Sequence, residues 1–238
     1  MLFECAKGGN GLRTALDNKR AKRIRLIVFT ALMTALTTAL TLASVPLASG
    51  YYNFGDIPIF MSACLLGPIP ALITGALGAM LGDIILGYMA YAPFTLVIKA
   101  LEGVIAGLLF KVIAKAVKKQ VPQSIFYCLG SILGGLEMAL GYFLAEGLLL
   151  AEDSWTGGVV NLPFNILQGT ISAVVATVLL YACQLKRVFE KIYNRASQVV
   201  SPAALDDTTA QNTSSDIEPT QESAQDDKTA ENNDDLRF

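Results

Sequence analysis

The chain has 238 residues, of which 53% are hydrophobic and 16% are charged. Soluble proteins average about 25% charged residues, so this composition favours a membrane protein. The chain has no histidine, its four cysteines show no CxxC spacing, and it contains no GxxxxGK[ST] motif. Histidine is the commonest general base and metal ligand, so its absence argues against hydrolases and zinc sites. We therefore expect no cofactor, no metal, no nucleic-acid partner and no ATP-binding P-loop.

The charge is distributed unevenly along the chain. Residues 197–238 contain ten acidic and two basic residues, whereas the preceding part contains ten acidic and sixteen basic residues. The C-terminal part has too few apolar residues to offset the entropy of ordering it. We expect a cytoplasmic N-terminal segment at 1–24, a membrane domain at 25–195 and a disordered acidic cytoplasmic tail at 196–238.

The first apolar span, at 26–48, follows a basic block at 19–25 with the sequence KRAKRIR. A signal peptide is the competing interpretation, because Ala48-Ser49-Gly50 resembles a cleavage site. The apolar stretch is, however, longer than the roughly 7–15 residues of a signal core, which favours a retained helix. Whether the N-terminal segment is processed stays open.

The next apolar stretch, Ile57–Leu86, contains Asp83 as its single charge. One span needs about 20 residues and two need about 40, so length does not decide between them. The sequence Gly67-Pro68-Ile69-Pro70 breaks a helix, which favours two short spans. The loop before this stretch holds Asn53 and Asp56, which can cap the following helix. Three further spans are expected at 93–110, 124–144 and 159–183.

Lysine and arginine in short loops indicate orientation. With six spans, the basic segments 19–25, 111–119 and 186–195 fall on one side. The opposite loops, at 50–56, 87–92 and 145–158, contain no lysine or arginine. We predict an all-α integral membrane protein, a six-transmembrane-helix bundle in a bacterial-type plasma membrane, with both termini in the cytoplasm.

Polar residues interrupt three consecutive spans at similar depth. Lys99 and Glu102 share one face of their helix, and at 1.5 Å per residue the polar groups of the three spans lie about 9–15 Å below the outer surface. A charge at such depth is costly and usually faces a bundle interior or a cavity. Either a ligand pocket or a hydrogen-bond network without ligand would satisfy these groups. The candidate substrate-binding residues are Asn53, Asp83, Tyr88, Tyr91, Lys99, Glu102, Glu137, Trp155, Asn161, Asn165 and Gln168.

Small residues form a stripe on the first span. Ala31, Ala35 and Ala39 recur every four residues and therefore lie on one helix face. Such stripes allow close approach of helices in lipid. The stripe either packs inside the bundle or docks on another membrane subunit, and the residue types alone leave both open.

The alanine stripe and the block YYNFGDIPIFMSACLLGPIPALITGALGAMLGDIILGYMAYAPFTLVIKALEG at 51–103 resemble the substrate-binding S component of energy-coupling factor (ECF) vitamin transporters. The Asp-Ile-Pro helix start, the Leu-Gly-Pro turn and the Lys-Ala-Leu-Glu-Gly stretch carry the resemblance, which covers about residues 24–185. It implies capture of a small water-soluble vitamin or precursor outside the cell. It also implies partners, a membrane coupling (T) subunit and two cytoplasmic ATPases, with Ala31, Ala35 and Ala39 as the docking face.

Two other classes of function stay in view. A self-sufficient secondary permease could use the same buried charges, although the two related halves of many such carriers are not visible here. A membrane enzyme could use Glu102 or Glu137 as a general base, but the spans contain no paired-carboxylate or metal-ligand signature. We therefore expect a binding subunit rather than an enzyme.

Overall fold

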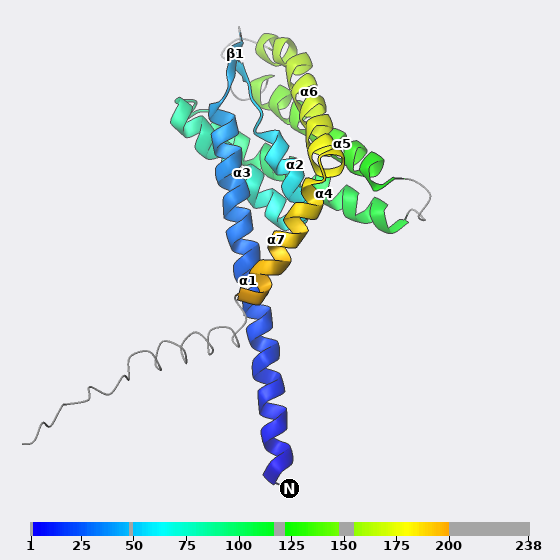
Figure 1. Cartoon of the computed structure of the whole chain (residues 1–238). Helices are drawn as coiled ribbons and strands as arrows, with labels where there is room; N and C mark the ends of the chain where they lie inside the picture. Colours follow the sequence, from blue (N-terminus) through cyan, green and yellow to red (C-terminus); the bar gives the residue numbers. More distant parts are fainter. Residues whose placement is uncertain (1, 48–49, 117–121, 148–154, 200–238) are drawn as a thin grey trace, which may run out of the picture.

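The computed structural model describes residues 2–47, 50–116, 122–147 and 155–199. The predicted acidic tail lies outside the described residues, apart from the last residues of the final helix. Helices dominate the fold (Figure 1), and five of them are long and apolar enough to cross a membrane. Exposed leucine, isoleucine and valine side chains are frequent on these helices, as expected for surfaces that face lipid rather than water.

The elements follow one another in a simple order. They are α1 (Leu2–Leu42), β1 (Val45–Leu47), β2 (Gly50–Tyr52), α2 (Asp56–Leu65), α3 (Pro68–Leu86), α4 (Ala92–Ala116), α5 (Gln123–Ala145), α6 (Thr156–Thr177), the π-helix η2 (Val178–Ala182) and α7 (Leu185–Val199). The predicted spans at 93–110, 124–144 and 159–183 match α4, α5 and α6 with η2 to within about six residues. The predicted span at 26–48 overlaps α1, but α1 begins far earlier, at Leu2, and ends at Leu42. The expected boundaries at residues 24 and 195 fall inside α1 and α7.

The stretch Ile57–Leu86 differs from the prediction of two spans. It forms the short helix α2 and one full-length helix, α3, with Gly67 at φ 101° between them. The predicted break at Gly67 is therefore confirmed. The ten residues of α2 extend about 15 Å, half of the hydrocarbon thickness of a bilayer. The antiparallel hairpin β1–β2, which pairs Val45 with Tyr52, lies instead where the end of the first predicted span at 26–48 and the loop at 50–56 were expected.

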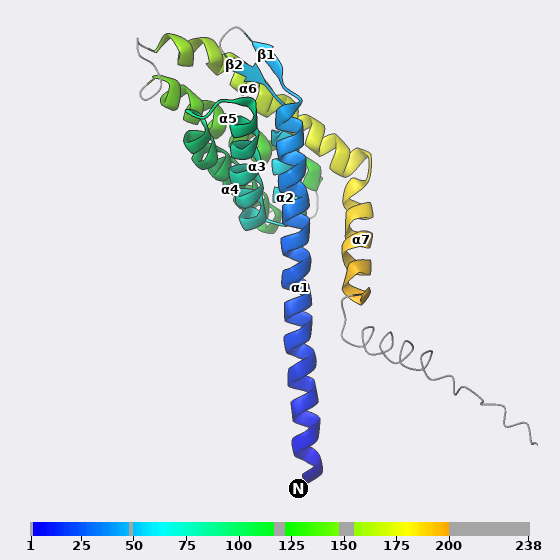
Figure 2. The same ribbon diagram turned by 90° about the vertical axis from the view of Figure 1, so that its left-hand side faces the viewer.

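The two ends of the described part of the chain lie on one side of the bundle. Figures 1 and 2 place the N-terminal half of α1 and the helix α7 at the end opposite the β1–β2 hairpin. This arrangement agrees with an even number of crossings. The structure itself carries no membrane, so which end faces the cytoplasm rests on the distribution of basic residues.

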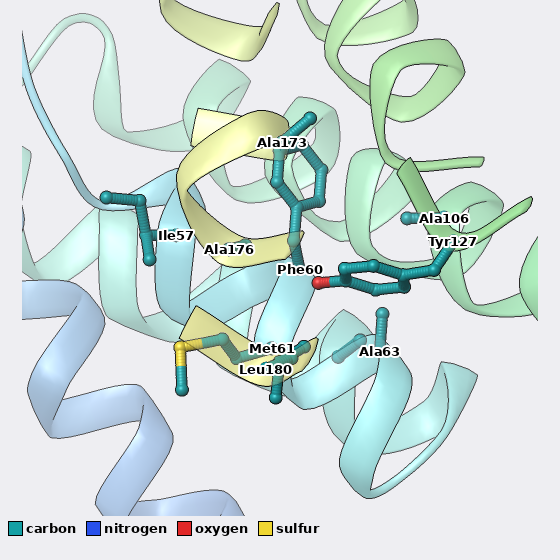
Figure 3. Packing of buried hydrophobic residues seen from close by; sticks show 10 residues of the cluster. Ile57, Phe60, Met61, Ala63, Ala106, Tyr127, Ala173, Ala176 and Leu180 are labelled. Atoms are coloured by element: carbon teal, nitrogen blue, oxygen red, sulfur yellow. The ribbon is translucent and has the colours of Figure 1, made fainter. Parts of the chain in front are cut away.

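The apolar core surrounds α2, whose residues 56–63 are all buried. Figure 3 shows Phe60 and Met61 of α2 among Tyr127 of α5, Ala173 of α6 and Leu180 of η2. Phe60 is completely buried, and the Tyr127 ring is 1% exposed. After its first turn, α2 is thus held in place by close apolar packing. This packing fixes the position of Asp56, the first residue of the helix.

Glycines allow the helices to approach closely where the polar residues lie. A methyl group on Gly169 of α6 would lie 2.7 Å from the Cα of Gly135 of α5, so the two backbones are in contact there. A methyl group on Gly75 of α3 would similarly overlap the carbonyl of Lys99 on α4. These crossings set the positions of neighbouring Gln168 and Lys99.

Substituting Gly169 tests the α5–α6 crossing. We expect Gly169→Ala to lower the free energy of unfolding by about 1–3 kcal/mol, because overpacking forces the two helices apart. Gly157→Ala is the matched control on the same helix, since a methyl group there meets nothing within 4 Å. Thermal unfolding in detergent measures both variants. Equal stability of the two variants would show that the crossing is not tight.

Candidate functional site

A charged network lies in the interior of the bundle and joins α2, α4 and α6. Lys99 is hydrogen-bonded to Oδ1 of Asp56, and its Nζ lies 3.0 Å from Oε2 of Glu102. Asp56 and Glu102 are completely buried, and Lys99 is 2% exposed. A buried charge is costly unless it is paired and hydrogen-bonded, so these three groups depend on one another.

Gln168 connects this ion-paired group to the loop after the hairpin. Its Nε2 donates to Oδ2 of Asp56 at 2.9 Å, and its Oε1 accepts from the backbone N–H of Asn53 at 3.1 Å. The Asn53 side chain accepts from the N–H of Gly55 at 2.8 Å. Both ends of the Gln168 amide are thus used, and the segment between β2 and α2 is tied to α6.

Carboxylate oxygens exceed the donors available to them. Oε2 of Glu102 has the Lys99 ammonium group as its ion-pair partner, whereas Oε1 of Glu102 and Oε2 of Glu137 accept no hydrogen bond from the described residues. Glu137 on α5 is close enough to interact electrostatically with Lys99 and Glu102. One cation therefore serves three carboxylates, counting Asp56. Acceptors left without donors in a buried site are groups that a bound molecule can satisfy.

Aromatic and hydroxyl groups border the network. The Lys99 Nζ lies 5.9 Å from the centre of the Tyr142 ring, and the Tyr142 hydroxyl donates to Oγ1 of Thr95 at 3.0 Å. Thr95 is 1% exposed. A ring against an ammonium group contributes a cation–π attraction. Tyr142 therefore belongs to the surroundings of Lys99, although sequence reasoning did not select it.

A second polar pair lies at the outer ends of α5 and α6. Asn161 donates to Oε2 of Glu146 at 3.0 Å, and both residues are 8% exposed. Burial raises the pKa of Glu146, and the hydrogen bond from Asn161 opposes that rise. Asn165, predicted on the same face as Asn161 and Gln168, is half-buried and takes part in no described hydrogen bond.

The other predicted site residues lie at varied positions. Asp83 is 1% exposed near the end of α3, and Tyr88 and Tyr91 form an edge-to-face pair with centroids 6.2 Å apart. Trp155 is 42% exposed and packs on Phe143, 5.2 Å between ring centres. The structure thus brings Asn53, Lys99, Glu102 and Gln168 into one network with Asp56. It places Trp155 at the surface, against the end of α5.

Asp56 is the main residue that sequence reasoning assigned differently. We expected it to cap a helix, but α2 is capped by Gly55 without a side-chain hydrogen bond. The Asp56 carboxylate instead pairs with Lys99 and Gln168. The sequence did contain an indication of this pairing, because a carboxylate at the start of one apolar run can form an ion pair with a lysine buried in a later run. Glu146 offered a weaker signal of the same kind.

Apolar helices with lipid-type surfaces and an interior ion-paired cluster define an integral membrane protein with a buried polar site. Comparison with known proteins specifies the class. The model of the family described as "ECF-type riboflavin transporter, S component" matches residues 21–186 of this chain. The chain belongs to this family of transporter components. The match confirms the resemblance noted in the sequence and the expectation of a transport protein rather than an enzyme.

Two relatives extend the comparison. The chain is 29% identical over 165 residues to the thiamine precursor transporter HmpT of Lactococcus lactis, which covers 69% of this chain and 89% of the relative. It is 37% identical over 131 residues to an uncharacterized protein of Pyrococcus woesei, which covers 55% of this chain and 80% of the relative. The family and HmpT together support vitamin transport.

Proposed function

We propose that this chain is the substrate-binding subunit of an ATP-driven ECF-type importer. It captures a vitamin or vitamin precursor outside the cell and delivers it through a membrane coupling subunit that works with two cytoplasmic ATPases. Membership of the S component family supports this role. The basic segments at 19–25, 111–119 and 186–195 support cytoplasmic ends for the chain by the positive-inside rule.

The surplus of carboxylate oxygens around Lys99 is the observation that carries the ligand assignment. Oε1 of Glu102 and Oε2 of Glu137 are buried without a hydrogen-bond donor among the described residues, so a ligand with N–H groups would satisfy them. Asn53 and Gln168 are hydrogen-bonded to one another and border the site, and Tyr142 lies beside the ammonium group. An amino-substituted nitrogen heterocycle fits this set. The named relative, a thiamine precursor transporter, supports an aminopyrimidine in particular.

The test begins with the protein purified in mild detergent. Mass spectrometry of small molecules released on denaturation identifies a co-purified ligand, and titration calorimetry then compares an aminopyrimidine thiamine precursor, thiamine and riboflavin. We expect the aminopyrimidine to bind most tightly. Tightest binding of riboflavin would contradict the ligand assignment but keep the subunit role. No binding of any water-soluble vitamin would favour a structural network.

Glu102→Gln tests the carboxylate directly. The amide keeps the size of the side chain but replaces an acceptor oxygen with a donor, so affinity should fall at least ten-fold, as expected when a buried charge-assisted hydrogen bond is lost. Glu190→Gln, on α7 and exposed, is the matched control and should bind normally. Unchanged affinity in Glu102→Gln would exclude Glu102 from the site.

The competing function is a self-sufficient secondary permease. Uptake into vesicles distinguishes the two, because a subunit of an ECF importer moves its ligand only when the coupling subunit and the ATPases are present. Uptake by this chain alone, driven by an ion gradient, would establish the permease instead.

A further inference from the structure

The helix α7 extends beyond the part of the chain that the family shares. The family match ends at residue 186, whereas α7 continues to Val199. The chain turns sharply before α7 at Gln184, whose φ of 56° is in the left-handed region. Figure 2 shows that α7 runs beside α1 rather than continuing α6. Substrate binding in the bundle assigns no role to this helix.

Aromatic contacts fix α7 against α1. The rings of Phe29 and Phe189 are 4.9 Å apart in an edge-to-face arrangement. Nη1 of Arg25 donates to the carbonyl oxygen of Tyr193 at 3.0 Å, and the Arg25 guanidinium lies 4.9 Å from the centre of the Tyr193 ring. These contacts place Tyr193 at the level of Arg25 along α1. Arg25 is the last residue of the basic block that precedes the first span.

The two helices therefore bring two basic segments to one level. On α7, Arg187, Lys191 and Arg195 recur every four residues and are all exposed, so they form one stripe. Within residues 19–25 of α1, the exposed basic residues are Lys19, Arg20, Lys22 and Arg23. Within residues 19–25 and 185–195 the single acidic residue is Glu190. We refer to residues 19–25 of α1 with 185–195 of α7 as the basic junction.

Apolar side chains adjoin the basic stripe. Val188 and Ile192, each one position after a basic residue of the stripe, are 48% and 54% exposed. Ile24 of α1 is 52% exposed. A helix with neighbouring basic and apolar faces is typical of the boundary between lipid headgroups and acyl chains. The level of the junction, at the end of a membrane span, is where phosphate groups lie.

We propose that the basic junction binds the headgroups of anionic phospholipids. Arg187, Lys191 and Arg195, together with the exposed basic residues of α1, contact the phosphates, and Val188 and Ile192 contact the acyl chains beneath them. Charge complementarity identifies the occupant, because a concentrated positive surface beside apolar side chains matches an anionic lipid. The free energy with which such residues bind an anionic leaflet grows roughly in proportion to the number of basic residues.

The test uses the full chain in mild detergent. Native mass spectrometry measures retained phosphatidylglycerol and phosphatidylcholine of identical acyl chains. We expect preferential retention of phosphatidylglycerol, and we expect Arg187→Gln/Lys191→Gln/Arg195→Gln to weaken it by about five-fold for each charge removed. Lys111→Gln removes an exposed lysine of α4 outside the junction and is the control, expected to retain the lipid normally.

Several results would overturn the proposal. Equal retention of phosphatidylglycerol and phosphatidylcholine would overturn it. That result would also be obtained if the acidic residues of the segment 196–238 neutralised the basic junction. Normal retention by the triple variant, with its thermal unfolding unchanged, would place the lipid elsewhere. Displacement of phosphatidylglycerol by an equal concentration of inorganic phosphate would identify a site for free phosphate rather than for lipid. Because the substituted residues are exposed, unfolding of the variant is not expected.

Discussion

Replacing Lys99 with methionine should lower the free energy of unfolding by about 3–5 kcal/mol. The substitution leaves the carboxylates of Asp56 and Glu102 buried without their cation, and both are completely buried. Removing one partner of a buried ion pair costs far more than the pair itself contributes. Thermal unfolding in detergent measures the loss. Lys111→Met, at an exposed lysine, should change stability by less than about 0.5 kcal/mol.

A triple variant separates the structural role of the charges from the functional one. Lys99→Met/Asp56→Leu/Glu102→Leu removes the cation together with both carboxylates. Replacing a whole buried ionic group by apolar residues is often neutral, so most of the lost stability should return. Ligand binding should not return, since the donors and acceptors are gone. A triple variant as unstable as Lys99→Met would show that uncompensated charge is not the cause of the loss.

Substituting Ala35 with leucine should abolish or strongly reduce transport while leaving ligand affinity unchanged. Ala31, Ala35 and Ala39 are all exposed on α1. The opposite face of α1 packs on α3, where Thr37 is completely buried and a methyl group on Gly78 would lie 2.6 Å from its Cβ. A small-residue face that is left open allows close approach of a partner helix, and leucine would prevent it. Uptake by the reconstituted complex and titration of the isolated chain measure the two effects.

The control adds similar bulk at a lipid-facing position away from α1. Leu140 on α5 is 54% exposed, so Leu140→Phe should leave both uptake and ligand affinity intact. Normal uptake in Ala35→Leu would show that the alanine stripe is not the docking face. Loss of ligand affinity in Ala35→Leu would instead indicate that the substitution disturbs the bundle itself.

The meeting of the charged residues inside the bundle could be predicted, because a charged side chain within a membrane span is too costly to expose to lipid. Lys99 and Glu102 interrupt an apolar span, and Gln168 lies on a polar face of another, so their meeting inside the bundle follows from the cost of exposing them to acyl chains. Loop residues are less constrained, since water satisfies their polar groups. Trp155 and Tyr88 could therefore be named from the sequence, but their distance from the network could not.

The role of Asp56 could not be derived locally. A carboxylate at the start of a helix is explained equally well as a cap, and only the contacts of Asp56 with Lys99 and Gln168 decide otherwise. Those contacts are made by residues 43 and 112 positions further along the chain, and they depend on α2 being a short helix that ends before the turn at Gly67. Thirty apolar residues fit one long span or two short ones, so no count of residues could identify this arrangement.

The sequence separation within the charged network has a consequence for biogenesis. Gln168 follows Asp56 by 112 residues, and it completes the set of donors around that carboxylate. At the usual rates of translation this separation corresponds to about 6–20 seconds. Lys99 follows Asp56 by 43 residues, so for the later part of that interval the nascent chain holds Lys99 and Asp56 without the α6 amide. The polar network in the bundle interior is therefore complete only after α6 has joined the helices made before it.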